Sequence, residues 1–280
     1  MNAVSNALQA PQRLAVRAPE GDIAPQRWDG GPIDCEGCAY VDLRARPSDD
    51  ISGRGCEPGH ACMQDAYARR IDRFFRWHPE LADQQIEHPY FEVRAIAARH
   101  ASVFRLGGLI TDPDETVRMQ VALRLSPVQL ERLIHDPHRE VRLRVAQRIT
   151  PDRLAAMRTD GDYGVREIVA QRLPAALLPT LARDPERIVR QIVARRMQMP
   201  ALLQMIHDPE PEVRRVVAEG LPAPLLDRLA DDSDWRVRWE VAQRAERSVL
   251  EQLQDDPDSE VQQMARSRLA PAPLKEVTHG

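Results

Sequence analysis

The chain has 280 residues, of which 39 are basic and 43 acidic, so its formal net charge is −4. Only 4 Trp, 4 Tyr and 4 Phe are present, which disfavours the large aromatic-lined cavity of a typical enzyme. No apolar run approaches the ~18 residues of a membrane span, and the first thirty residues lack the apolar centre of a secretory signal. We therefore expect a cytoplasmic protein that is not an enzyme and has no contact with a membrane.

The N-terminal part of the chain is expected to be a small metal-binding module. Residues 1–29 are polar and contain several prolines, which predicts a disordered segment. All four cysteines follow within a short stretch, in the pattern C-x2-C-x17-C-x5-C: Cys35, Cys38, Cys56 and Cys62. In a reducing compartment such a cluster indicates a metal site rather than disulfides.

The spacing of the cysteines leaves the nature of the metal open. Four thiolates bind either Zn²⁺ or an iron–sulfur cluster. The second pair is C-x5-C, unlike the two C-x2-C pairs of a zinc ribbon, and the ferredoxin run C-x2-C-x2-C is also absent. Disulfides or free thiols are a third alternative. His60 lies between two of the cysteines and is interpreted as a solvent-facing loop residue rather than a zinc ligand.

Residues 63–87 are expected to form a helical cap. Five apolar or aromatic side chains fall on one helical stripe: Met63, Tyr67, Ile71, Phe74 and Phe75. A repeat stack requires such a cover over its exposed end. We therefore assign residues 30–87 to the cysteine module and its capping helix.

From residue 88 onward the sequence repeats every 24 residues. Seven full repeats and a partial eighth begin at His88, Asp112, Asp136, Asp160, Asp184, Asp208, Asp232 and Asp256. Position 6 is Val in all of them, and position 19 is Leu in the seven full repeats. A fixed period with constant apolar positions predicts a solenoid over residues 88–280, ending in a short tail.

Each repeat predicts one α-helix and a shorter second helix. The opening Asp-Pro, as in Asp112-Pro113, is typical of a helix N-cap followed by proline at the first helical position. Apolar residues at positions 6, 10, 11 and 14 form one stripe of a helix of about twelve residues. A break follows, and then leucines three apart, as in Leu130 and Leu133, favour a 3₁₀ turn. No segment alternates with period two, so we expect no strands.

The consensus D-P-x-x-x-V-R-x-x-V-A-x-R-L…L-x-x-L over residues 88 to about 269 resembles the leucine-rich repeat variant family. The resemblance implies an all-α, right-handed superhelix of alternating α- and 3₁₀-helices. HEAT-type repeats also begin D-P-x-x-x-V-R, but they need thirty or more residues per unit. The pattern has departures, among them Gly220 where most other repeats have Arg at position 13.

The same resemblance bears on the metal. Variant-repeat proteins carry an N-terminal cysteine domain that binds a [4Fe–4S] cluster, similar in place and spacing to residues 30–62. The resemblance therefore implies that Cys35, Cys38, Cys56 and Cys62 hold such a cluster, with Zn²⁺ as the alternative.

Position 7 of the repeats forms a row of arginines: Arg118, Arg142, Arg166, Arg190, Arg214 and Arg238. Such a row could bind a partner, because guanidinium groups bind oxyanions bidentately. The alternative is ion pairing between repeats, since residues 88–280 hold 29 basic and 29 acidic side chains. This balance argues against nucleic acid as a partner.

We expect an iron–sulfur protein that acts as an interaction scaffold for an unknown protein bound on a solenoid face. We also expect it to be a monomer. The alternatives are an electron carrier or redox sensor that uses the cluster, and a zinc-binding or nucleic-acid-binding repeat module.

Overall fold

The computed structural model describes residues 23–45 and 55–270. The chain divides into two compact units, Met1–Arg105 and Leu106–Gly280. Within the described ranges there is no strand, and only two isolated bridges occur, between Arg27 and Asp65 and between Glu57 and Ala61. The all-α fold expected from the repeat pattern is confirmed.

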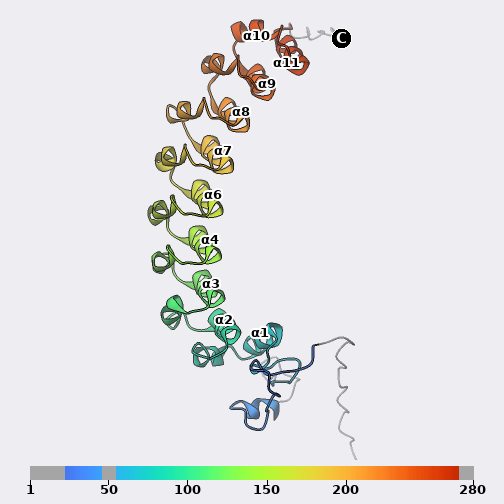
Figure 1. Ribbon diagram of the computed structural model, residues 1–280, viewed down its shortest axis with the longest axis vertical. Helices are drawn as coiled ribbons and strands as arrows, with labels where there is room; N and C mark the ends of the chain where they lie inside the picture. The colour runs from blue at the N-terminus through green and yellow to red at the C-terminus, as the bar shows by residue number, and fades with distance from the viewer. Residues whose placement is uncertain (1–22, 46–54, 271–280) are drawn as a thin grey trace, which may run out of the picture. The chain divides into compact units, whose positions relative to one another are not determined.

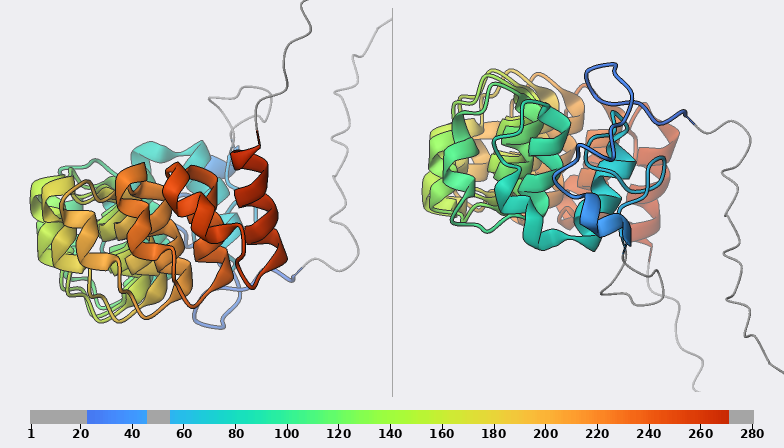
Figure 2. Two further views of the ribbon diagram at one scale, coloured as in Figure 1. Left: turned by 90° about the horizontal axis from the view of Figure 1, so that it is seen from above. Right: turned by 90° about the horizontal axis from the view of Figure 1, so that it is seen from below.

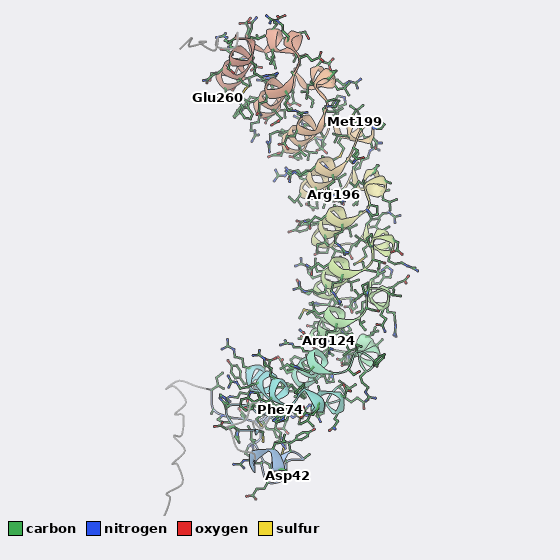
Figure 3. The ribbon with its side chains drawn as sticks, turned by 180° about the vertical axis from the view of Figure 1, so that it is seen from behind. Asp42, Phe74, Arg124, Arg196, Met199 and Glu260 are labelled. Carbon is green, nitrogen blue, oxygen red and sulfur yellow. The ribbon has the colours of Figure 1, made fainter. Side chains whose placement is uncertain are left out.

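The first unit contains the cysteine module and four helical elements: η1 (Val41–Ala45), α1 (Ala68–Trp77), η2 (Pro79–Gln84) and α2 (Phe91–His100). α1 packs against α2, the α-helix of the first repeat. Ile71, Phe74 and Phe75 are at most 1% exposed on α1, and Figure 3 labels Phe74 there. Three members of the predicted stripe are therefore on the buried face of this helix, whereas Met63 and Tyr67 precede the helix.

Residues 23–29 belong to the ordered part of the first unit. The Ile23 carbonyl accepts a hydrogen bond from Arg70 Nη2, and the Trp28 ring stacks on Tyr90 with 5.6 Å between centroids. The predicted disorder over residues 1–29 is therefore wrong for residues 23–29, because backbone and ring contacts hold this stretch. Residues 1–22, and the predicted tail over residues 271–280, lie outside the described residues.

The second unit is a stack of the predicted repeats. Its α-helices are α3 (Glu115–Arg124), α4 (Arg139–Arg148), α5 (Pro151–Leu154), α6 (Tyr163–Arg172), α7 (Arg187–Arg196), α8 (Pro211–Gly220), α9 (Trp235–Arg244), α10 (Arg247–Leu253) and α11 (Ser259–Leu269). Its 3₁₀ elements are η3 (Leu106–Thr111), η4 (Gln129–Leu133), η5 (Ala155–Met157), η6 (Ala175–Leu181), η7 (Ala201–Met205) and η8 (Ala223–Leu229). The 3₁₀ element predicted for each repeat is thus present in most of them, while α10 replaces it in the last full repeat.

Successive α-helices of the second unit pack side by side in chain order, as Figure 1 shows for α3, α4, α6, α7, α8 and α9. Viewed along the stack in Figure 2, the helices lie one behind another. The valines at position 6 are fully buried, from Val117 to Val261. The alanines at position 11, such as Ala146 and Ala170, are also fully buried, and their small side chains let neighbouring helices approach closely.

The α-helices begin later in the repeat than the Asp-Pro pair predicted. Their N-caps lie at position 3, where Asp114 accepts from Thr116 N–H and Asp258 accepts from Glu260 N–H. The aspartate at position 1 instead accepts a backbone N–H two residues further on, as Asp136 does from His138 at 2.9 Å. The predicted N-cap role of the first aspartate is therefore wrong, because its carboxylate closes a turn before the helix.

Candidate metal centre

The four cysteines line one small pocket of the first unit. The other lining residues are Ile33, Asp34, Val41, Arg44, Pro58 and Gln64. We call this the cysteine pocket. All four side chains are free thiols; Cys62 is buried, and the other three are partly exposed. Residues far apart in the sequence are thus brought to a single site.

Tight turns bring the cysteines into the pocket. Asp34 Oδ1 accepts the N–H groups of Glu36 and Gly37, each at 3.0 Å, and this fixes the turn between Cys35 and Cys38. Glu57 and Ala61 exchange two backbone hydrogen bonds of 2.8 Å, which closes the loop between Cys56 and Cys62. Gly59 lies in this loop with φ +78°, a conformation that strongly favours glycine.

Backbone groups surround the sulfur atoms. The Tyr40 N–H donates to Cys38 Sγ at 3.4 Å, and the Tyr40 carbonyl accepts from the Cys56 thiol at 3.8 Å. The phenol of Tyr40 accepts from Gln85 Nε2 at 2.7 Å, which connects the pocket to the residue after η2. Donors aimed at sulfur are what thiolate ligands of a metal require.

Burial raises the pKa of two of the thiols. It raises the pKa of Cys62 to about 11, against the hydrogen bond from Gln64 N–H, which lowers it. Burial, followed by the negative charge of Cys38 and Cys35, also raises the pKa of Cys56. A raised pKa favours the neutral thiol, whereas a bound metal deprotonates the thiols that coordinate it.

A second feature of the cysteine pocket, the side chain of Gln64, also fits a bound metal–sulfur group. The side-chain oxygen Oε1 of Gln64 is buried and has no hydrogen-bond partner. Beside four thiols, this unpaired amide can offer its NH₂ end to a sulfur of a bound group after a half-turn of the amide. Across residues 23–45 and 55–270, however, no three His, Cys, Asp or Glu side chains are grouped around a position for one metal ion.

A buried ion pair fixes the segment that carries Cys62. Arg70 Nη1 lies 3.1 Å from Asp65 Oδ2, and the two side chains are only 4% and 1% exposed. Asp65 also accepts the N–H of Tyr67 at 2.9 Å, just before α1. Sequence reasoning missed Gln64, Asp65 and Arg70, because no repeat or motif marks them. His60 is exposed, as expected, and its Nδ1 lies 2.7 Å from Arg73 Nη1.

The arginine row at position 7 serves the solenoid itself. Each side chain makes a bidentate ion pair with the first aspartate of the following repeat, 18 residues on: Arg118–Asp136, Arg142–Asp160, Arg166–Asp184, Arg190–Asp208, Arg214–Asp232 and Arg238–Asp256. Each Nη1 also donates to the carbonyl of the first aspartate of its own repeat. The structure does not support the predicted partner-binding role of these six arginines, because their donors are engaged within the stack.

The second arginine row, at position 13, covers backbone carbonyls of the preceding repeat. Arg244 donates to Ala218 O at 3.0 Å and to Leu221 O at 2.7 Å. Arg196, labelled in Figure 3, donates to Ala170 O at 2.6 Å. The position-7 and position-13 rows therefore both act between repeats, in agreement with the ion-pair and capping alternative.

These features define a helical repeat protein with a four-cysteine site in its N-terminal module. The family model for the "LRV protein FeS4 cluster" matches residues 25–84, and models for the leucine-rich repeat variant and the HEAT repeat match residues 163–186 and 199–223. A solved structure described as a leucine-rich repeat variant with a novel repetitive structural motif is 43% identical, with a TM-score of 0.75. The alignment covers 84% of this chain and 98% of that one. The chain belongs to the leucine-rich repeat variant family.

A curated relative is also similar. The uncharacterized 27.7 kDa protein in nifB 3′ region of Rhodobacter capsulatus is 46% identical over 107 residues. The match spans 38% of this chain and 40% of that relative's length. In the described part of this chain, no helix has both the length and the apolar character needed to cross a bilayer.

Proposed function

We propose that this chain is a protein-interaction scaffold, without enzymatic activity, whose N-terminal module carries a [4Fe–4S] cluster on Cys35, Cys38, Cys56 and Cys62. The observation that carries the proposal is the meeting of four free thiols at one pocket, inside the segment that matches the iron–sulfur family model. Bound there, the cluster supplies cross-linking of the module and one-electron chemistry.

The iron–sulfur family model that matches residues 25–84 favours a cluster over zinc at the four cysteines of the pocket. The four thiols alone suit either group, because both Zn²⁺ and iron–sulfur clusters bind cysteine thiolates.

Purification under anaerobic conditions with metal analysis tests the cluster. We expect brown protein with about four irons and four sulfides per chain. Cys35→Ser should lower this content, whereas Met63→Leu should retain it, because Met63 is buried beside Cys62 but does not line the pocket. Colourless protein with one zinc per chain would contradict the proposal.

The scaffold role is supported by the repeat fold and by apolar side chains that the stack leaves uncovered. Tyr163 on α6, Ile188 on α7 and Trp235 on α9 are 50%, 40% and 42% exposed. Pull-down with the full chain, compared with Trp235→Ala and with the control Val128→Ala at an exposed site before η4, tests this role. Recovery of no protein partner would contradict the scaffold role, and equal recovery by all three forms would contradict a contribution of Trp235.

A second candidate, an electron carrier, is favoured by the partial exposure of Cys35 and Cys38. Electron transfer requires a cluster near the surface, whereas a purely structural one does not. If oxidation and reduction of the loaded protein leave partner recovery unchanged, while a small redox protein exchanges electrons with it, the carrier role replaces the scaffold role.

A further inference from the structure

Gln64 has a side-chain amide that no protein contact uses. Its backbone carbonyl accepts from Trp28 N–H at 3.2 Å. Its side chain lines the cysteine pocket, and the buried Oε1 atom has no hydrogen-bond partner. The backbone carbonyl is therefore engaged, while the side-chain oxygen lies at the pocket without a hydrogen-bond partner.

The groups that line the pocket indicate which end of the Gln64 amide can form a hydrogen bond there. The polar side chains that line the pocket with Gln64 are the four cysteines, Asp34 and Arg44. The cysteine sulfurs accept hydrogen bonds and donate none once they are thiolates. The two ends of a glutamine amide exchange places by a half-turn about the last side-chain bond, and the oxygen and nitrogen have nearly the same shape. The buried site that Oε1 occupies can thus hold the NH₂ group instead.

We propose that the Gln64 side chain donates a hydrogen bond from Nε2 to a sulfur of the cluster and raises its reduction potential. This inference rests on the proposed function, because it requires the cluster at the four cysteines. Reduction adds a negative charge to the sulfurs, so an N–H donor stabilises the reduced state more than the oxidised state. Gln64 is thus a positioning and tuning residue, and the four cysteines remain the ligands.

The test replaces the amide by a side chain of similar size without a donor. We expect Gln64→Met to load the same iron and sulfide as the wild type but to show a more negative midpoint potential. Pulsed electron paramagnetic resonance of the reduced protein in H₂O and D₂O should show one exchangeable-proton coupling in the wild type that the variant lacks. A role in packing alone would leave this coupling in place.

Two further variants complete the design. Gln64→Asn keeps the amide on a shorter side chain and should give a potential between those of the wild type and Gln64→Met. Gln64→Asn is also the variant to measure if Gln64→Met fails to bind iron. Gln171→Met on the exposed face of α6 is the matched control and should change nothing.

The outcomes are distinct. A wild-type protein without iron or sulfide would overturn the proposed function itself. A loaded wild type whose potential and proton coupling are unchanged in Gln64→Met, or in Gln64→Asn if the former does not load, would overturn the role of Gln64 alone.

Discussion

The guanidinium of Arg190 holds the carboxylate of Asp208 in a two-point contact, with Nε–Oδ2 at 2.7 Å and Nη2–Oδ1 at 3.1 Å. The third nitrogen of the same group donates to the Asp184 carbonyl at 2.8 Å. All three residues are less than 9% exposed. One side chain thus joins the start of its own repeat to the start of the next, and five other arginines repeat this contact.

Replacing Arg190 should destabilise the stack strongly. Arg190→Met leaves the buried Asp208 carboxylate unpaired, and breaking a buried pair from one side costs about 3–5 kcal/mol. Arg190→Lys should lower the free energy of unfolding less than Arg190→Met, because lysine keeps the positive charge but lacks the planar guanidinium that makes two hydrogen bonds. Urea unfolding followed by circular dichroism measures the difference. Arg195→Met, at an exposed position of the same helix, is the control and should stay near the wild type; similar losses in both Met variants would contradict the prediction.

The Arg238–Asp256 ion pair should make the stability of the fold depend on pH in the acidic range. Burial tends to raise the pKa of Asp256, but hydrogen bonds from Arg238 and from the Asp258 N–H outweigh this and lower it below its ordinary value near 3.8. A carboxyl whose folded pKa is depressed stabilises the fold above its unfolded pKa, and this contribution is lost as the pH falls through the folded value. Unfolding free energies between pH 7 and pH 2.5 should therefore drop less in Asp256→Asn than in the wild type. Asp255→Asn, at a well-exposed neighbour, should follow the wild-type curve, and parallel curves for all three would refute the assignment.

Glu240 should respond to pH in the opposite sense. Burial, and then the negative charge of Glu219, raise the pKa of this carboxyl on α9. The charged form therefore destabilises the fold at neutral pH, and the penalty disappears as the pH falls through the folded pKa toward the unfolded one. Glu240→Gln should raise the free energy of unfolding at pH 7 and have little effect near pH 4. Glu260→Gln on α11 is an exposed comparison; a loss of stability in Glu240→Gln at pH 7 would show that the charge is favourable.

Gly220 interrupts the arginine row at position 13. By the repeat, an arginine here would reach the carbonyls of Ala194 and Met197, and it would also remove a helical glycine that costs about 1 kcal/mol. A side chain must displace Leu202, whose Cδ2 lies 2.8 Å from the position of a Cβ at Gly220. Because this atom is the end of a side chain, we expect Gly220→Arg to stabilise by about 1 kcal/mol and Gly220→Ala by less. Thermal unfolding measures both, and destabilisation by both would mean that Leu202 cannot move.

The repeat was predictable from the sequence because it is local and regular. Val141 and Ala146 recur at fixed positions, and the structure buries both completely. The start of each helix was predicted too early, because an aspartate that closes a turn and one that caps a helix look alike in a sequence. The sequence also did not decide whether Arg190 binds a partner or forms an ion pair between repeats. The choice depends on whether Asp208 lies within reach of the Arg190 guanidinium.

The cysteine module was predictable only through its ligands. The four thiols carry a recognisable spacing, but Gln64 and the Asp65–Arg70 pair depend on contacts between segments that share no period. Glutamine is common in loops, and only its orphaned Oε1 beside the thiols marks it out. Residues that support such a site become visible only when the backbone path around it is known.

The fixed distance of 18 residues between paired Arg and Asp has a consequence for how this chain can change in length. An insertion or deletion of one residue between Arg190 and Asp208 shifts the carboxylate away from its guanidinium and breaks their ion pair. Duplication or removal of a complete 24-residue unit creates a junction of the same kind as those already present. The solenoid can therefore grow or shorten in whole steps of one repeat, and each step changes the number of units without changing the chemistry that joins them.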